Sequence, residues 1–164
     1  MKTLIRLIAV ILTLGFGSVS QAGMLAYKSG SYLYAVNSDG NMILNAVYGV
    51  DNYQVSENIV AYVSGNYLYA KSATGQSIVE AIYGVDSWRI TDTMMIYKSG
   101  SYLYAKNYRG QTVLNAVYGV DSYQVSDSIL AYKSGNYLYA KNVDGADVLS
   151  AIYGIDDFTL SRGR

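Results

Sequence analysis

The chain is dominated by one sequence unit of 35 residues that occurs four times in succession. The units begin at Leu25, Val60, Met95 and Leu130, so they cover residues 25–59, 60–94, 95–129 and 130–164. Twelve of the 35 positions are identical in all four copies. Repeats of this length are typical of proteins in which each unit buries its apolar surface against its neighbours. The sequence therefore predicts an array of four equivalent modules.

Each unit contains four short runs of aromatic and β-branched residues. In the first unit they cover residues 25–29, 31–36, 43–48 and 53–56, and turn-forming glycine, asparagine and aspartate separate them. Such runs, at intervals of eight to ten residues, predict β-strands joined by tight turns. Several runs are apolar at consecutive positions, which is typical of strands buried on both faces. The predicted fold class is therefore all-β, with four antiparallel strands per 35-residue unit.

Four-stranded units arranged around an axis form the blades of a β-propeller, which typically has four to eight blades. One stretch of the chain also resembles the propeller blades of the Tol-Pal translocation protein and its relatives. A polar-ended strand at 121–127 precedes Ile129-Leu130-Ala131-Tyr132, then 136–139 and an Asp144-Gly145 turn. The resemblance implies architecture only, and it implies that the strand at 123–126 is the innermost strand of its blade.

On that basis the chain starts at the second strand of a blade and ends with an innermost strand, Phe158-Thr159-Leu160. Pairing of this last strand with the first three would close a four-bladed propeller and remove its exposed edges. Two other assemblies remain open. The chain can supply half of an eight-bladed homodimer, or it can form an open β-solenoid. A β-trefoil is excluded because it needs three units.

The first 22 residues differ from the rest and read as a cleavable signal peptide. Lys2 and Arg6 precede an apolar stretch from Leu7 to Phe16, and small residues lead to a cleavage site after Ala22. The stretch is shorter than the roughly 20 residues that span a bilayer, which disfavours a retained anchor. The sequence thus predicts a propeller domain at 23–164 that is periplasmic or secreted, with no membrane span after cleavage.

Composition excludes several classes of function. The chain has no histidine and no cysteine, which removes the common nucleophile triads and the usual zinc ligands. Without Lys2 and Arg6, ten basic residues face 12 acidic ones, so no basic surface for nucleic acid is predicted. A carboxylate pair for glycoside hydrolysis remains conceivable, but near-identical repeats argue against a single active site. We therefore expect no enzyme, no catalytic residues, no metal site and no cofactor.

Two repeated positions are candidates for ligand binding. One is an aspartate that follows Tyr-Gly-Val or Tyr-Gly-Ile in every unit, and the other is the tyrosine three residues before it. The candidates are Asp51, Asp86, Asp121, Asp156, Tyr48, Tyr83, Tyr118 and Tyr153, together with Trp88. Four carboxylates around an axis can hold a cation or sugar hydroxyls, and aromatic faces can stack on sugars. The alternatives are that each aspartate caps its own turn and that each tyrosine packs between blades.

These features predict an exported, non-enzymatic binding module of a lectin-like kind, with repeated equivalent ligand sites. The alternative is a structural scaffold that docks a protein partner of the cell envelope. In that case variable positions such as Glu80, Arg89, Tyr108 and Arg109 would matter more than the invariant ones. The predicted partners are a glycan or an envelope protein, and the predicted assembly is a monomer or a homodimer that completes a larger ring.

Overall fold

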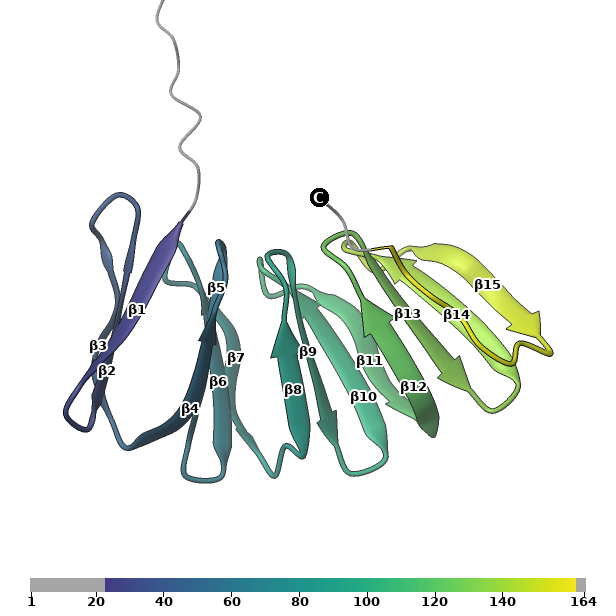
Figure 1. The fold of residues 1–164 in the computed structure, drawn as a ribbon, viewed down its shortest axis with the longest axis horizontal. Helices are drawn as coiled ribbons and strands as arrows, with labels where there is room; N and C mark the ends of the chain where they lie inside the picture. The colour runs from purple at the N-terminus through teal and green to yellow at the C-terminus, as the bar shows by residue number, and fades with distance from the viewer. Residues whose placement is uncertain (1–22, 162–164) are drawn as a thin grey trace, which may run out of the picture.

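The computed structural model describes residues 23–161 and consists of four antiparallel β-sheets that stand side by side in chain order (Figure 1). No helix occurs in this range, and none of its residues therefore belongs to a helix that could span a membrane. The predicted signal peptide lies outside the described residues. The all-β fold class and the propeller-blade arrangement of the repeats are confirmed.

The first sheet has three strands and the other three sheets have four strands each. The first sheet contains β1 (Met24–Ser29), β2 (Tyr32–Asn37) and β3 (Met42–Tyr48). The second contains β4 (Val50–Val55), β5 (Ile59–Ser64), β6 (Tyr67–Ser72) and β7 (Ser77–Tyr83). The third contains β8 (Ser87–Ile90), β9 (Met94–Ser99), β10 (Tyr102–Asn107) and β11 (Thr112–Tyr118). The fourth contains β12 (Val120–Val125), β13 (Ile129–Ser134), β14 (Tyr137–Asn142) and β15 (Asp147–Tyr153).

The sheets are offset from the sequence repeat by one strand. The last strand of each repeat pairs with the first strand of the next repeat, as β4 does with β5 (Tyr53 opposite Tyr62). Each connection from one sheet to the next is therefore only one or a few residues long, as between Tyr48 and Val50. This one-strand offset between the sequence repeat and the sheets agrees with the expectation that the first strand, β1, corresponds to the second strand of a blade.

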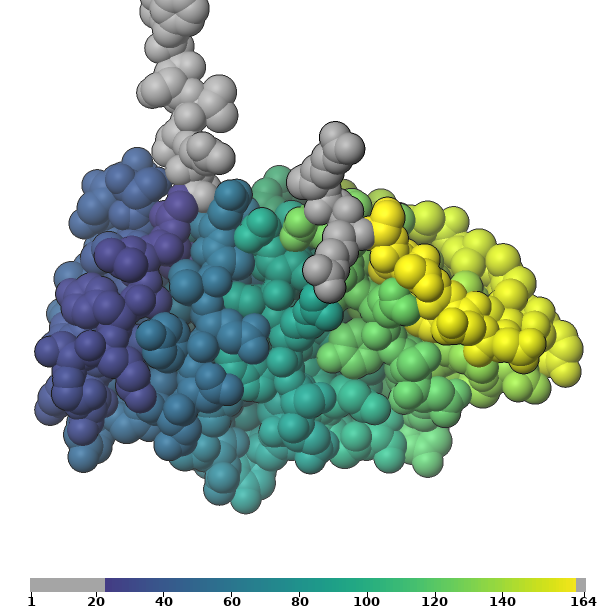
Figure 2. All heavy atoms as spheres, viewed as in Figure 1, coloured from purple at the N-terminus to yellow at the C-terminus, as the bar shows by residue number. Residues whose placement is uncertain are grey.

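Apolar side chains fill the space between neighbouring sheets. Figure 2 shows the neighbouring sheets in direct contact along the row. We call the sheet face that bears Leu33 and Ala35, and its equivalents, the leading face. We call the opposite face, which bears Leu25, Tyr27 and Tyr34, the trailing face. At each junction the leading face of one sheet packs on the trailing face of the next, as Leu33 and Ala35 do on Tyr62. The core of the protein thus consists of three repeated inter-sheet layers.

The predicted closure of the ring by the C-terminal strand is not present. The first and last sheets lie at opposite ends of the row, so residues 154–161 do not reach β1 (Figure 1). Phe158, Thr159 and Leu160 form no strand. Instead the Gln124 side chain on β12 binds them, donating to the Phe158 carbonyl at 2.7 Å and accepting from the Leu160 N–H at 2.9 Å. Over residues 23–161 the array is therefore open at both ends.

Candidate functional site

Each sheet exposes a pair of tyrosines in which the rings contact each other. In the first sheet Tyr32 at the start of β2 lies opposite Tyr48 at the end of β3, and the ring centroids are 5.4 Å apart with a 57° tilt. The same geometry recurs in the pairs Tyr67–Tyr83, Tyr102–Tyr118 and Tyr137–Tyr153. The second tyrosine of each pair is between 65% and 68% exposed in all four copies, at Tyr48, Tyr83, Tyr118 and Tyr153. The sequence-based alternative, that these tyrosines pack between blades, is therefore wrong.

A β-bulge places both rings of a pair on the same sheet face. In the first sheet Leu33 pairs with Val47 but Ala35 pairs with Leu44, so Asn45 and Ala46 lie opposite a single residue. An extra residue reverses the side-chain alternation beyond it. Leu44 consequently lies on the leading face, whereas Tyr48, four residues later, lies on the trailing face beside Tyr32.

The bulge places an alanine in a left-handed backbone conformation in three sheets. The φ angles are 54° at Ala46, 48° at Ala81 and 48° at Ala116. This region costs an L-residue roughly 1–2 kcal/mol, and glycine occupies it without that penalty.

We expect Ala81→Gly to raise the free energy of unfolding by up to about 1 kcal/mol, because glycine removes this strain. Chemical denaturation of the purified variant measures the effect. Ala70→Gly is the control, since Ala70 lies in β6 without a positive φ and is buried, so its replacement should destabilise. A loss of stability in Ala81→Gly would contradict the strain argument.

The second sheet also carries a hollow beside its exposed tyrosine. The hollow has a volume of about 260 Å³ and lies between the β5–β6 turn and the segment after β7. Its lining includes Tyr83, Asn66 and Gly65. An aromatic face and an amide side chain are thus available together at this point.

The invariant aspartates hold turns. The carboxylate of Asp51 accepts a hydrogen bond from the Gly65 N–H at 2.9 Å, and Asp86 and Asp121 accept equivalent bonds from Gly100 and Gly135. Each bond joins the start of one strand to the hairpin turn 14 residues later. The aspartates therefore accept backbone N–H bonds, as one sequence alternative expected, but from the following hairpin and not from their own turn. Asp156 is exposed in the segment after β15. The aspartates lie on separate sheets, and residues 23–161 contain no acidic cluster that could hold a metal ion.

Trp88 lies away from the exposed tyrosine pairs. It sits opposite Tyr97 in the β8–β9 ladder and packs, half-buried, in the layer between the second and third sheets. The structure thus brings together the two tyrosines of each pair, whereas Trp88 lies apart from them. Asp51 reaches the hollow beside Tyr83 only through its hydrogen bond with Gly65. The first tyrosine of each pair (Tyr32 and its equivalents) was not predicted as a site residue from the sequence. Its identity in all four repeats is the signal that could have identified it.

A second set of tyrosines is buried and forms parallel stacks. Tyr62 stacks on Tyr69 at 5.0 Å with a 12° angle between the rings, and Tyr97 and Tyr132 stack on equivalent partners. Burial, and secondarily the adjacent tyrosine, raises the pKa of Tyr62, Tyr97 and Tyr132. These hydroxyls stay neutral, and the stacked tyrosines belong to the core.

A polar groove of about 540 Å³ runs across the ends of β4, β8 and β12. Arg89 of β8 lines it, whereas the equivalent positions on the neighbouring sheets are Gln54 and Gln124. The loops on its rim are linked, since the Asp92 N–H donates to the Asp127 carboxylate at 2.9 Å. Arg89 forms no ion pair with any residue of 23–161.

Arg89 also influences one buried tyrosine of the same sheet junction. Burial raises the pKa of Tyr123, and the positive charge of Arg89 partly opposes this rise. Arg89, Tyr123 and Gln124 together line a smaller hollow of about 220 Å³ that adjoins Leu160 and Ser161. Arg89 is thus a charged residue at a position where two of the other repeats carry glutamine.

No family model matches the chain, and no curated protein matches it. Among solved structures, a eukaryotic initiation factor superposes with a TM-score of 0.55 at 18% identity, over 87% of this chain and 43% of that one. The N-terminal domain of Nup159 gives 0.47 at 14% identity, over 82% and 41%. Hsv2 from Kluyveromyces lactis gives 0.46 at 11% identity, over 75% and 43%.

The chain therefore spans less than half the length of each of these structures. Identities this low concern the fold alone, and the superposition on the initiation factor, with its TM-score of 0.55, supports a β-propeller architecture. The fold thus defines a protein of the β-propeller class, built from four near-identical repeats. A specific relation to the Tol-Pal propeller is not shown by these comparisons.

Proposed function

We propose that this protein is an exported, non-enzymatic binding module whose four tyrosine pairs are equivalent sites for a carbohydrate ligand. One observation carries the proposal: the same aromatic pair recurs in four copies with almost identical ring geometry and exposure. Large aromatic side chains normally bury most of their area, because this burial is favourable. We therefore infer that tyrosines that are two-thirds exposed at four equivalent positions are surfaces for contact with a ligand.

The chemistry of these pairs suits a sugar ring. One tyrosine face offers a flat apolar surface to the C–H bonds of a sugar, and its tilted partner limits the approach to one direction. The turn residue beside each pair adds polar groups for the hydroxyls: Ser31, Asn66, Ser101 or Asn136. Single sites of this kind bind weakly, and four of them on one rigid array gain avidity for a repeating ligand.

The proposal places the protein in the periplasm or outside the cell, since residues 1–22 read as a signal peptide. It assigns no catalytic role, because the candidate residues occupy equivalent positions in every repeat. An exported array with repeated weak sites fits the capture of a polymer that presents many copies of one sugar.

A glycan array tests this proposal. We expect the purified protein to bind a defined group of glycans, and Tyr118→Ala combined with Tyr83→Ala to reduce the signal at least tenfold. Tyr118→Phe with Tyr83→Phe is the matched control and should retain most of the signal, because the stacking ring remains. Absence of glycan binding by the folded protein, or binding that survives the alanine changes, would contradict the proposal.

A second function, docking of a protein partner, is favoured by the polar groove around Arg89. The groove is larger than the hollow at Tyr83, and it carries a cation that pairs with no acidic residue of the described part of the chain. If this function holds, Arg89→Ala should abolish capture of the partner while the tyrosine variants retain it. The opposite pattern is expected for the carbohydrate proposal.

A further inference from the structure

The trailing face of the first sheet is exposed, although its equivalents in the other sheets are buried. Leu25 is 60% exposed, whereas the equivalent residues Val60, Met95 and Leu130 are fully buried. Tyr27 is 43% exposed, whereas Tyr132 at the same position of the last unit is 5% exposed. The first sheet thus presents a surface that elsewhere in this protein always has a neighbouring sheet on it.

The leading face of the last sheet is exposed in the same way. Val148 is 53% exposed, whereas the equivalent Val113 is 3% exposed because the fourth sheet covers it. Ile152 of β15 is also among the exposed large apolar residues. Exposed apolar surfaces of this kind mark interaction sites in soluble proteins.

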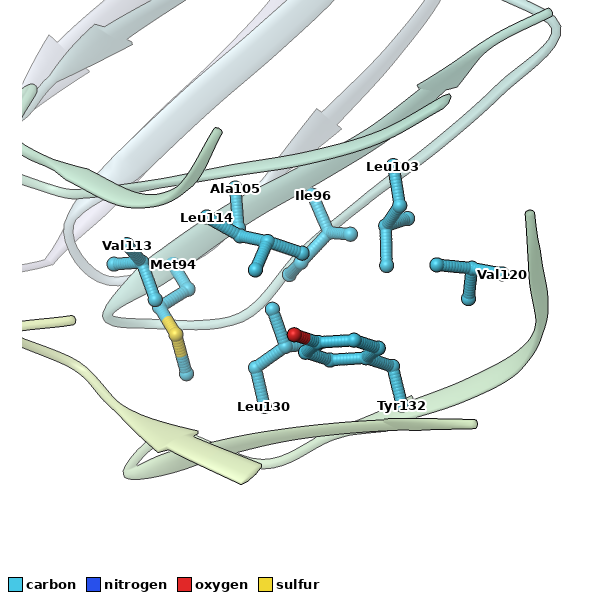
Figure 3. Packing of buried hydrophobic residues seen from close by; sticks show 9 residues of the cluster. All are labelled: Met94, Ile96, Leu103, Ala105, Val113, Leu114, Val120, Leu130 and Tyr132. Atoms are coloured by element: carbon cyan, nitrogen blue, oxygen red, sulfur yellow. The ribbon is translucent and has the colours of Figure 1, made fainter. Parts of the chain in front are cut away.

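The two exposed faces are complementary to each other. Figure 3 shows the layer between the third and fourth sheets, where Leu130 and Tyr132 of the trailing face insert against Ile96, Leu103 and Leu114. This leading-to-trailing arrangement recurs at all three junctions. The exposed leading face of the last sheet and the exposed trailing face of the first sheet are the two halves of a fourth such junction.

The backbone supports the same arrangement. Within residues 23–161 the first sheet has no strand equivalent to β4, β8 or β12, so β1 is an open edge there. Residues 158–160 follow the pattern of those inner strands but pair with no sheet. The β4–β5 register, with Tyr53 opposite Tyr62 and Gln54 opposite Ala61, predicts Phe158 opposite Tyr27 and Thr159 opposite Ala26.

We propose that a second copy of this chain covers both exposed faces, and that two copies form a closed eight-bladed ring. Residues 158–160 of each copy add the missing inner strand to β1 of the other copy, a known mode of strand addition. Head-to-tail contacts of this type either close into a ring or extend into a filament. The ring removes both open edges and doubles the number of tyrosine pairs to eight. This proposal does not depend on what the tyrosine pairs bind.

Cysteine cross-linking tests the proposal directly, because the chain contains no native cysteine. Ala26→Cys and Thr159→Cys are made in separate copies of the protein, mixed, and treated with a short thiol-specific cross-linker. We expect a covalent dimer in the mixture and none with either variant alone, since the contact is head-to-tail. Lack of cross-linking in the mixture, or dimers from one variant alone, would overturn the proposal.

The double variant Ala26→Cys/Thr159→Cys distinguishes the possible assemblies. An eight-bladed ring gives a covalent dimer and no longer species. A ladder of longer species means a filament, and an internal cross-link in a single chain means a closed four-bladed ring, so either result contradicts the proposal. Light scattering on the native protein should give twice the chain mass. Leu25→Asp should halve that mass while the circular dichroism spectrum stays unchanged, because Leu25 contributes little to the core of one copy.

Discussion

Replacement of Tyr132 by alanine is expected to lower the free energy of unfolding by about 3–5 kcal/mol. Tyr132 is 5% exposed and fills the layer between the third and fourth sheets, where it contacts Leu103 and Ile96 (Figure 3). The change leaves a cavity in this layer and also removes the stack on Tyr139, in which the rings are 5.0 Å apart. Stacked aromatic pairs add about 0.5–1.5 kcal/mol beyond their burial.

The matched control is Tyr118→Ala, the same substitution in a tyrosine that is 67% exposed. It should change the free energy of unfolding by less than about 1 kcal/mol, because it removes one exposed ring contact with Tyr102. Urea denaturation followed by tyrosine fluorescence measures both variants. Equal losses in the two variants would contradict the division of tyrosines into a buried set and an exposed set.

Replacement of Asn107 by alanine is expected to cost about 1–3 kcal/mol, because it leaves buried polar groups without partners. The Asn107 side chain is fully buried. It accepts hydrogen bonds from the Arg109 and Gln111 N–H groups at 3.1 and 3.0 Å. Its amide donates to the Val143 carbonyl of the next sheet at 3.2 Å, so it also ties two sheets together.

Asn142 provides the control for this prediction, since it occupies the same position in the last repeat. Its side chain accepts the equivalent bonds from Asp144 and Ala146 at 3.1 and 2.9 Å, but in an exposed turn. Water can replace those bonds, so Asn142→Ala should cost less than half as much as Asn107→Ala in the same denaturation experiment. A larger loss at Asn142 would show that burial between sheets is not what makes Asn107 important.

The positions of the strands, and the offset between the sequence repeat and the sheets, could be predicted because the residues that determine them are close together in the sequence and recur four times. Runs such as Tyr32-Leu33-Tyr34-Ala35 form strands wherever they recur, and Gly30 or Gly40 marks the turns between them. Comparison of four copies also separates the invariant positions from the variable ones. The offset between repeat and sheet followed from the order of the runs within a unit.

The orientation of the exposed tyrosines could not be predicted, because it depends on the bulge at Ala46. Nothing in a Leu-Asn-Ala-Val-Tyr run indicates that an alanine adopts a positive φ and moves Tyr48 to the other face. An invariant tyrosine in an apolar strand reads equally well as a core residue. The role of the aspartates was predicted only in part. Acceptance of a backbone N–H bond was among the alternatives, but Asp51 accepts it from Gly65, 14 residues later, and not from its own turn.

Ring closure could not be predicted for a different reason. The sequence contains an inner-strand segment at 158–160 and an open edge at β1, but it does not reveal how far apart they lie. That distance depends on the angle between successive sheets, which arises from packing in the three inter-sheet layers. Those layers involve residues far apart in the sequence, such as Leu33 and Tyr62.

The central claim, that the four exposed tyrosines are equivalent binding sites, is tested most directly by a graded series of variants. Tyr48, Tyr83, Tyr118 and Tyr153 are changed to alanine one, two, three and four at a time, and binding to an immobilised glycan is measured. We predict that every single variant weakens binding by a similar factor, and that avidity falls stepwise until the fourfold variant shows none. Loss of all binding from one particular tyrosine, or full binding by the fourfold variant, would contradict the claim.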